Sequence, residues 1–374
     1  MEIIVHNSEI ALKGKNRPFF EKCLVRNIEN FLLRHDVKIN YLKKDDARII
    51  CSVDDKIMLD KIFGVKDFCF AEETGNDIKD IVKKASEILK KMDVKKTIAV
   101  KTKRADKNLK YTSMEISRKI GEIAYEKGFK IDLTNPDETL NVEITNKKAY
   151  LYTNKMKGPG GLPVGCSGKV LCLFSGGIDS SVAAWLMMKR GCKVDYLHFH
   201  ALKNNNEVKK TKIKKLFDLL SDYEENPKLF LIPYFNYQLA VVDKINDKYD
   251  VVVFRNFMLR LAEKFALKNG YKALVTGDSL GQVASQTLDN LKAIGYKVNM
   301  PILRPLIGYD KQEIVDLAKK IGTYEESIKE YKDCCSMISR KPSTSVKLEQ
   351  LEKEFLKFDM NKIIDDEYKN IEKF

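Results

Sequence analysis

The sequence predicts a multidomain α/β protein with two small α+β units followed by a doubly wound parallel sheet. The chain has 374 residues, more than one hydrophobic core usually covers, so two or three domains are expected. Strand and helix patterns mix irregularly before residue 155, whereas they alternate regularly after residue 169. Between these parts lies KMKGPGGLPVGCSGK, whose glycines and prolines are typical of a linker.

The first α+β unit is expected at residues 1–58 and the second at residues 59–155. In the first, EIIV (2–5) and RIICSV (48–53) have the pattern of strands, and a helix is predicted near 18–34. The second is predicted to hold helices at 76–92 and 113–127 and strands at 97–104, 140–145 and 148–153.

A linker at residues 156–168 is expected to lead into a third domain at residues 169–374. Its apolar runs do not alternate with polar residues, which is typical of strands covered on both faces of a parallel sheet. Strands are predicted at 170–174, 193–201, 229–234 and 273–277, with helices near 180–190, 208–222 and 254–268.

The composition limits the classes of function. The excess of 67 basic over 53 acidic residues gives a net charge of +14, which favours a polyanionic partner. No apolar stretch is long enough for a membrane span, and the N-terminus lacks the pattern of a secretory signal, so we expect no membrane association and a cytoplasmic protein. The eight cysteines form no CxxC pair, which disfavours zinc.

The segment SGGIDSS, residues 175–181, follows the first strand of the third domain. Gly176 and Gly177 allow a close approach of the backbone to an anion, the hydroxyls of Ser175 and Ser180 can donate to it, and a helix is predicted to begin near Asp179. The segment therefore predicts a phosphate-binding loop that is neither a Walker A loop nor a dinucleotide fingerprint. An ordinary strand–turn–helix junction, in which Asp179 is only a cap, is the alternative.

A second polar segment, TGDSLGQVASQT (276–287), is predicted to end another strand and begin another helix at the same sheet edge. It contains too many polar groups for a buried helix face, and the residues concerned are Gly277, Ser279, Gln282, Ser285 and Gln286. A second contribution to the ligand site is one interpretation, and a solvated surface is the other.

These segments resemble the tRNA 4-thiouridine synthetase family along nearly the whole chain. SGGIDSSVAAWLMMKRG, TGDSLGQVASQT and DCCSMISRKPS are similar to its PP-loop ATP pyrophosphatase domain. KTKRADKNLKYTSMEI and IDLTNPDETLNVEI resemble its THUMP RNA-binding domain, and EIALKGKNRPFFEKCL resembles its N-terminal ferredoxin-like domain. The chain looks like a short form of the family, without the rhodanese-like domain of many bacterial relatives.

The resemblance implies an ATP-dependent tRNA uracil 4-sulfurtransferase. Such an enzyme adenylates O4 of a uridine near the tRNA elbow and replaces that oxygen with sulfur, releasing AMP and pyrophosphate. Two other functions stay open: a PP-loop enzyme that adenylates a small molecule, and a THUMP-type RNA-binding protein without catalysis. Whether the chain also supplies sulfur for thiamine synthesis is left open.

The resemblance also implies residues that bind ATP. They are Leu173, Phe174, Ser175, Gly176, Gly177, Ser180, His198, Phe199, Arg255, Gly277 and Gln286. His198 and Phe199 could equally be ordinary strand residues. Asp179 is the predicted catalytic acid, either by holding Mg²⁺ on the pyrophosphate or by positioning the attacking oxygen.

Cys335 is the predicted sulfur-carrying nucleophile. The family pattern C-x-x-I-S-x-x-P is reproduced from Cys335 to Pro342, and neighbouring basic residues favour a reactive thiolate. Cys334 would be a neighbour or a resolving thiol, Cys166 is a conceivable disulfide partner, and an inert pair of thiols is the alternative. The sulfur donor stays open among a desulfurase-charged persulfide, sulfide and an iron–sulfur cluster.

A basic stretch at residues 94–110 is the predicted RNA-binding surface. Its candidate contacts to phosphates are Lys101, Lys103, Arg104, Lys107 and Lys110. On the predicted strand 97–104, alternation places Lys101 and Lys103 outward, although a solvated face would have the same pattern. The resemblance further implies a homodimer in which one subunit holds the tRNA for the other.

Overall fold

The computed structural model describes residues 1–45, 48–105, 110–202, 204–331 and 343–374. The chain divides into two compact units, Met1–Pro163 and Val164–Phe374, so the division falls inside the predicted linker. Within the described ranges, no helix is long and apolar enough to cross a membrane.

The first unit contains two α+β halves that share one sheet. Its elements are β1 (Glu2–Asn7), η1 (Glu9–Asn16), α1 (Arg17–Arg34), β2 (Ile39–Asp45), β3 (Arg48–Val53), β4 (Val65–Gly75), α2 (Ile78–Leu89), β5 (Thr97–Arg104), α3 (Ser113–Glu126), β6 (Lys130–Ile131), β7 (Glu138–Ile144), β8 (Lys148–Tyr152) and β9 (Met156–Lys157). The strand order is β2-β3-β1-β4-β8-β7-β5-β6, with β9 beside β4. The strands and helices predicted for this unit are confirmed, whereas η1, β2, β4, β6 and β9 were not predicted, and β9 lies in the predicted linker.

Strand β4 connects the two halves. Its first part pairs antiparallel with β1, from Val65 to Ala71, and its last part pairs antiparallel with β8, from Glu72 to Gly75. Each half has its own core, one beneath α1 and one beneath α2 and α3. The halves are therefore joined by a continuous backbone ladder rather than by a flexible connection.

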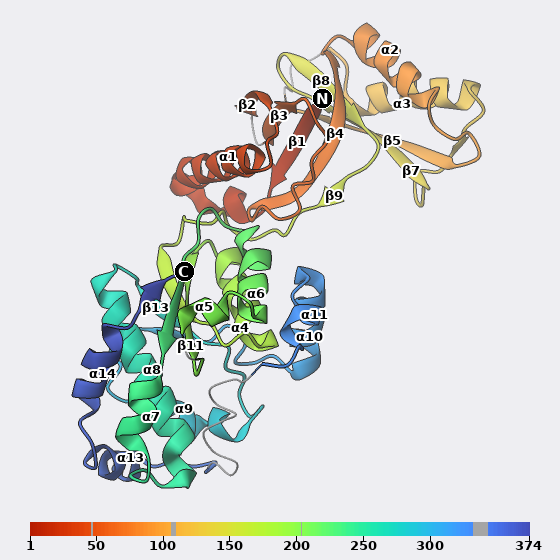
Figure 1. Cartoon of the computed structure of the whole chain (residues 1–374). Coiled ribbons are helices and arrows are strands. Elements are labelled where there is room, and N and C mark those ends of the chain that lie inside the picture. The colour runs from red at the N-terminus through yellow and green to blue at the C-terminus, as the bar shows by residue number, and fades with distance from the viewer. Residues whose placement is uncertain (46–47, 106–109, 203, 332–342) are drawn as a thin grey trace. The chain divides into compact units, whose positions relative to one another are not determined.

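The second unit is the doubly wound domain that the sequence predicts. Its elements are β10 (Lys169–Leu173), α4 (Ile178–Lys189), β11 (Lys193–His200), α5 (Asn205–Val208), α6 (Lys212–Ser221), β12 (Leu229–Pro233), α7 (Phe235–Val241), α8 (Asp247–Lys268), β13 (Ala273–Val275), η2 (Ala284–Gln286), α9 (Leu288–Ile294), β14 (Ile302–Leu303), α10 (Lys311–Ile321), α11 (Tyr324–Ser327), α13 (Leu348–Phe355), α14 (Met360–Tyr368) and β15 (Glu372–Lys373). The sheet order is β14-β13-β10-β11-β12-β15, parallel except for β15 at the edge. Helices α4 and α8 both pack on β10, on opposite sides of the sheet (Figure 1).

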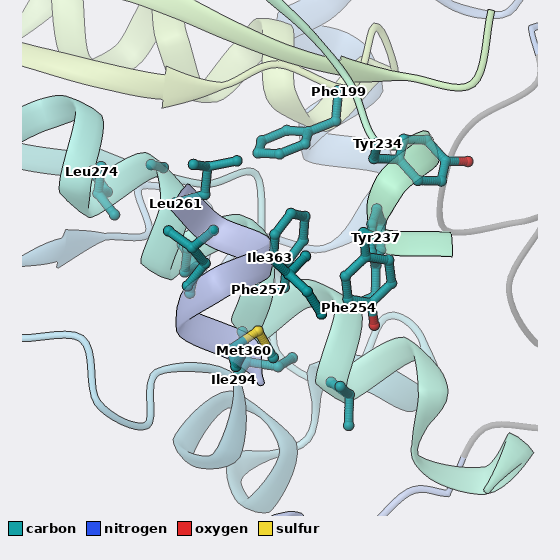
Figure 2. Packing of buried hydrophobic residues seen from close by; sticks show 14 of the residues in the cluster. Phe199, Tyr234, Tyr237, Phe254, Phe257, Leu261, Leu274, Ile294, Met360 and Ile363 are labelled. Carbon is teal, nitrogen blue, oxygen red and sulfur yellow. The ribbon is translucent and has the colours of Figure 1, made fainter. Parts of the chain in front are cut away.

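An aromatic core fixes α8 to the sheet. Figure 2 shows the rings of Phe199, Tyr237 and Phe257 in this core, where Tyr237 and Phe257 stack with centroids 4.5 Å apart. Nearly every residue from Val251 to Phe257 is buried, because α8 lies between the sheet and the C-terminal helices. This packing holds Arg255, one residue after the buried Phe254, at a defined place beside the carboxyl ends of the strands.

Candidate nucleotide site

The predicted phosphate loop lies between β10 and α4. Gly176 has a φ of 78°, which favours glycine, and a Cβ there would collide with Cδ1 of Ile213 at the start of α6. Gly177 is the N-cap of α4, and its carbonyl accepts hydrogen bonds from the hydroxyls of Ser180 and Ser181, both at 3.2 Å. The first N–H groups of α4 therefore point toward the loop, as anion binding requires.

Asp179 lies in the first turn of α4 and has two polar partners. Its Oδ1 accepts from Lys311 Nζ at 2.7 Å, and its Oδ2 accepts from Gln282 Nε2 at 2.8 Å. Lys311 is the first residue of α10, which packs against α4. Lys311 was not predicted from the sequence, because nothing in the local pattern DKQE distinguishes it from an ordinary helix start.

Gly277 brings the second polar segment onto the phosphate loop. A Cβ at this position would lie 2.8 Å from both the carbonyl carbon of Asp179 and the amide nitrogen of Ser180. These are backbone atoms, so any larger residue would push the two loops apart. The two sequence segments therefore meet at the ends of the adjacent strands β10 and β13.

The segment 276–287 follows a strand and leads into a helix, as predicted, since Thr287 is the N-cap of α9, but most of it is not part of that helix. Strand β13 ends at Val275 and α9 begins at Leu288, with an irregular loop and the short η2 between them. The alternative interpretation, a solvated polar surface, does not hold for Asp278, Ser279, Ser285 and Gln286, which are buried. The loop stays irregular because its side chains bond inward, as when Ser279 donates to the Tyr309 carbonyl.

Asp278 is the centre of a buried ion-pair network that the sequence analysis did not predict. Its carboxylate pairs with Arg255 and, at 3.3 Å, with Arg304, and it accepts from the Thr276 hydroxyl at 2.7 Å. Burial alone would raise the pKa of Asp278, but the Arg255 and Arg304 charges and the Thr276 bond lower it. The network fixes Arg255 next to Ser285, 3.4 Å away.

His198 is buried behind the phosphate loop. Its Nδ1 lies 2.7 Å from the Phe174 carbonyl and its Nε2 lies 2.9 Å from the Tyr331 hydroxyl. Burial lowers its pKa to about 3, so the ring is neutral. The rings of Phe174 and Phe199 are buried in the domain interior, so a contribution of these residues, or of the half-buried Leu173, to ATP binding stays a prediction.

The predicted catalytic cysteine lies outside the described residues, as does Cys334 beside it. Cys172 and Cys192 are buried, as predicted, and burial raises the pKa of Cys172 to about 12 and that of Cys192 to about 11. Such thiols are unreactive at neutral pH. Cys166 is half-buried. In the part of the chain that the structure describes, no group of three or more His, Cys, Asp or Glu side chains could hold a metal ion.

The predicted RNA-binding residues lie on β5 and after it. Lys101 and Lys103 are exposed, as predicted from the alternation, and Lys110 is exposed as well. Arg104 is half-buried and donates to the Tyr111 carbonyl at 2.6 Å, while Lys107 lies outside the described residues.

Two grooves of the first unit flank Lys103. One is a largely apolar groove between β5 and α3, to which Met114 and Tyr125 contribute. The other has a lining rich in basic residues that was not predicted from the sequence, with Lys15, Arg17, Lys44, Arg48 and Lys103 beside His6, Glu21 and Glu143. Glu143 in this lining accepts from the Tyr152 hydroxyl at 2.7 Å and from His6 Nε2 at 3.1 Å, and it pairs with Arg48.

Comparison with known families agrees with this arrangement. Residues 165–360 match the model of the thiamine biosynthesis protein ThiI, residues 75–154 match the THUMP domain, and residues 2–69 match the ThiI ferredoxin-like domain. The chain belongs to the ThiI family. The fold class predicted from the sequence, with ferredoxin-like, THUMP and PP-loop domains, is thereby confirmed.

Relatives of this ThiI-family chain match it over almost its whole length. It is 42% identical to a probable tRNA sulfurtransferase of Thermoanaerobacter pseudethanolicus, over 97% of each chain. A probable tRNA sulfurtransferase of Methanocaldococcus jannaschii is 41% identical, over 94% of this chain and 96% of that protein. A crystal structure of a 4-thiouridine synthetase–RNA complex with bound ATP matches with a TM-score of 0.89 and 34% identity, over 100% of this chain and 98% of that one.

Proposed function

We propose that this protein is an ATP-dependent tRNA sulfurtransferase that converts a uridine of tRNA into 4-thiouridine. The uridine O4 attacks the α-phosphorus of ATP and pyrophosphate leaves; sulfur then adds at C4 and AMP leaves. The proposal is supported by the relatives named tRNA sulfurtransferase and by the similar 4-thiouridine synthetase with ATP and RNA. The observation that carries it is the meeting of the Ser175–Ser181 loop with Gly277 at the ends of β10 and β13.

The loop is suited to bind the phosphates of ATP. The backbone around Gly176 and Gly177 and the N-terminus of the 12-residue α4 would surround the departing pyrophosphate. Lys311 would balance its charge, because its ammonium group already lies beside the loop on Asp179. The buried Gln286 and the fixed Arg255 would contact the nucleotide from the neighbouring loop.

We further propose that Mg²⁺ accompanies the ATP. Mg²⁺ is usually held by one or two carboxylates together with phosphate oxygens, and Asp179 is a carboxylate of the phosphate loop. Its Oδ1 bonds to a half-exposed lysine and its Oδ2 to a glutamine side chain, both of which can move away when a metal ion enters. The ion would neutralise the leaving pyrophosphate.

Sulfur would reach the uridine through Cys335, with Cys334 as its neighbour or as a resolving thiol. Burial keeps Cys172 and Cys192 as thiols, which argues against either as the sulfur carrier, whereas the half-buried Cys166 of the same unit is not eliminated by burial. We infer that a cysteine desulfurase charges Cys335 with a persulfide whose outer sulfur attacks C4 as AMP leaves. A second thiol, Cys334 or the added reductant, then breaks the S–S bond to Cys335 and is oxidised to a disulfide with it, which releases the thiolated base. Free sulfide can replace this route in vitro without a change of oxidation state.

The tRNA would be held by the first unit. The exposed Lys101, Lys103 and Lys110 and the basic groove beside them offer phosphate contacts without base readout. Contacts of the half-buried Arg104 and of Lys107, which lies outside the described residues, stay predictions. We propose that two copies of the chain act together in the cytoplasm, with one copy presenting the tRNA to the catalytic unit of the other.

The decisive experiment supplies the protein with ATP, Mg²⁺, a thiol reductant and tRNA, and measures 4-thiouridine by its near-ultraviolet absorbance. The wild type should form it both with cysteine plus a desulfurase and with sodium sulfide. Cys335→Ala should lose the first activity and keep the second, whereas full activity in both assays would remove Cys335 from the mechanism. ATP cleavage without any need for tRNA would instead favour a small-molecule substrate.

A further inference from the structure

A buried carboxylate lies in the lining of the basic groove beside Lys103. It belongs to Glu21 of α1, whose side chain is almost fully buried. Burial would raise the pKa of Glu21, but hydrogen bonds from Lys44 and Arg17 and the charges of these residues lower it, so the carboxylate is ionised. A negative charge repels phosphate, so its presence in a surface that we propose to bind RNA requires an explanation.

Two cationic side chains from different elements bind this carboxylate. Arg17, at the start of α1, donates from Nε to Oε1 of Glu21 at 2.7 Å. Lys44, in β2, donates from Nζ to Oε2 at 2.6 Å. Each oxygen of the carboxylate therefore holds one cation. Because one negative charge balances only one of the two positive charges, the three side chains together keep an excess positive charge.

Both cations keep donors for a further partner. Arg17 uses only Nε, so the two terminal NH₂ groups of its guanidinium remain, and Lys44 keeps two N–H groups. Neither side chain has another ion pair or side-chain hydrogen bond within the described ranges. The side chains of Arg17 and Lys44 are 33% and 47% exposed. Such donors match the oxygens of a phosphate group, which an arginine can bind with both terminal groups.

Glu143, the other carboxylate in the lining of the groove, is arranged differently. It pairs with Arg48 and His6, whose side chains are only 11% and 19% exposed. The partners of Glu143 therefore lie mostly inside the unit, whereas the partners of Glu21 reach its surface. Of the two carboxylates, Glu21 is the one that holds accessible cationic groups at the groove.

We propose that Glu21 is a positioning residue for RNA binding: it holds Arg17 and Lys44 so that one backbone phosphate binds between them. The inference rests on the proposed function, in which the first unit binds tRNA. A lysine or arginine that is not held loses rotamer freedom when it binds a phosphate. Since Glu21 already restricts both side chains, less of this entropy is left to lose when RNA binds.

The test measures the dissociation constant of a tRNA transcript for the full-length chain and for Glu21→Gln at several salt concentrations. Glutamine keeps the size of the side chain but can accept from only one of the two cations, so at least one of them is released. We expect about five-fold weaker binding and a smaller dependence on salt. Charge alone predicts the opposite sign, because the substitution removes a negative charge beside the phosphate.

Glu87→Gln is the matched control. Glu87 of α2 pairs with Lys84 at 2.9 Å, and it is not among the residues that line the two described grooves. The control removes the same charge from the same unit, and it should not weaken tRNA binding.

Arg17→Gln and Lys44→Gln test the same site without changing the buried carboxylate. Each should weaken tRNA binding about five-fold as well. They decide alone if Glu21→Gln lowers the thermal midpoint of the first unit so far that it unfolds.

Two results would overturn the inference. One is binding by folded Glu21→Gln that is as tight as that of the wild type, or tighter. The other is wild-type binding by both Arg17→Gln and Lys44→Gln, which is also the result expected of a site for free phosphate. Failure of the proposed function is distinguishable: a wild type that binds tRNA but forms no 4-thiouridine refutes that function alone, whereas a wild type that does not bind tRNA refutes both.

Discussion

Gly277→Ala should separate the two loops of the nucleotide site. The added methyl would lie 2.8 Å from the backbone carbon of Asp179 and from the backbone nitrogen of Ser180, whereas unbonded carbon atoms normally stay about 3.5 Å or more apart. The loops must therefore separate by roughly 0.7 Å. Overpacking of this kind costs about 1–3 kcal/mol, and a shift approaching 1 Å at reacting groups can slow a reaction by about 100-fold.

We expect Gly277→Ala to lower the thermal midpoint of the catalytic unit by about 2–10 °C and the rate of 4-thiouridine formation by about 10- to 100-fold. Calorimetry and the near-ultraviolet assay measure the two effects. Gly308→Ala is the matched control in the same unit, because nothing lies within 4 Å of its added methyl. If Gly277→Ala binds ATP and turns over as the wild type does, the two loops do not form one site.

Four further predictions follow from the same contacts. Asp179→Asn should reduce thiolation at least about 100-fold while hardly changing the thermal midpoint, since its ion pair is partly exposed. Phe199→Ala should cost about 3–5 kcal/mol in denaturant titrations, because the ring is buried in the core. Changing Lys101 and Lys103 to Gln should weaken tRNA binding and reduce its salt dependence, read as the slope of log K against log salt, by about one per residue. Burial would raise the pKa of Glu143, but its bonds to partners such as a neighbouring histidine lower that pKa. The ionised carboxylate therefore stabilises the first unit, and this stabilisation should be lost as the pH falls from about 5 to about 2. Urea midpoints of the first unit that stay constant over that range would contradict this.

The sequence predicted the parts of the site that depend on local chemistry. The loop Ser175–Asp179 could be placed because an apolar strand, two glycines and a helix start follow one another directly. The outward direction of Lys101 and Lys103 followed from strand alternation alone. Such features need only a few neighbouring residues to be specified.

The parts that the sequence could not predict depend on contacts between distant residues. Lys311 meets Asp179 across 132 positions, and Arg304 meets Asp278 across 26. The loop 276–287 was misread because its polar side chains have buried partners elsewhere in the fold, which no local pattern reveals. Strand β4 was missed, and its residues from Val65 to Gly75 mix apolar and charged side chains without regular alternation.

Strand β4, which both halves of the first unit share, limits how these halves can move relative to each other. Because one unbroken backbone hydrogen-bonds to β1 at its start and to β8 at its end, bending the ferredoxin-like half against the THUMP half would break ladder bonds. The two halves should therefore move together as one rigid body. Cutting the chain between residues 58 and 59 would leave each piece with an unpaired sheet edge, which favours aggregation. For the proposed binding of tRNA, this would mean that contacts made by the two halves keep a fixed spacing.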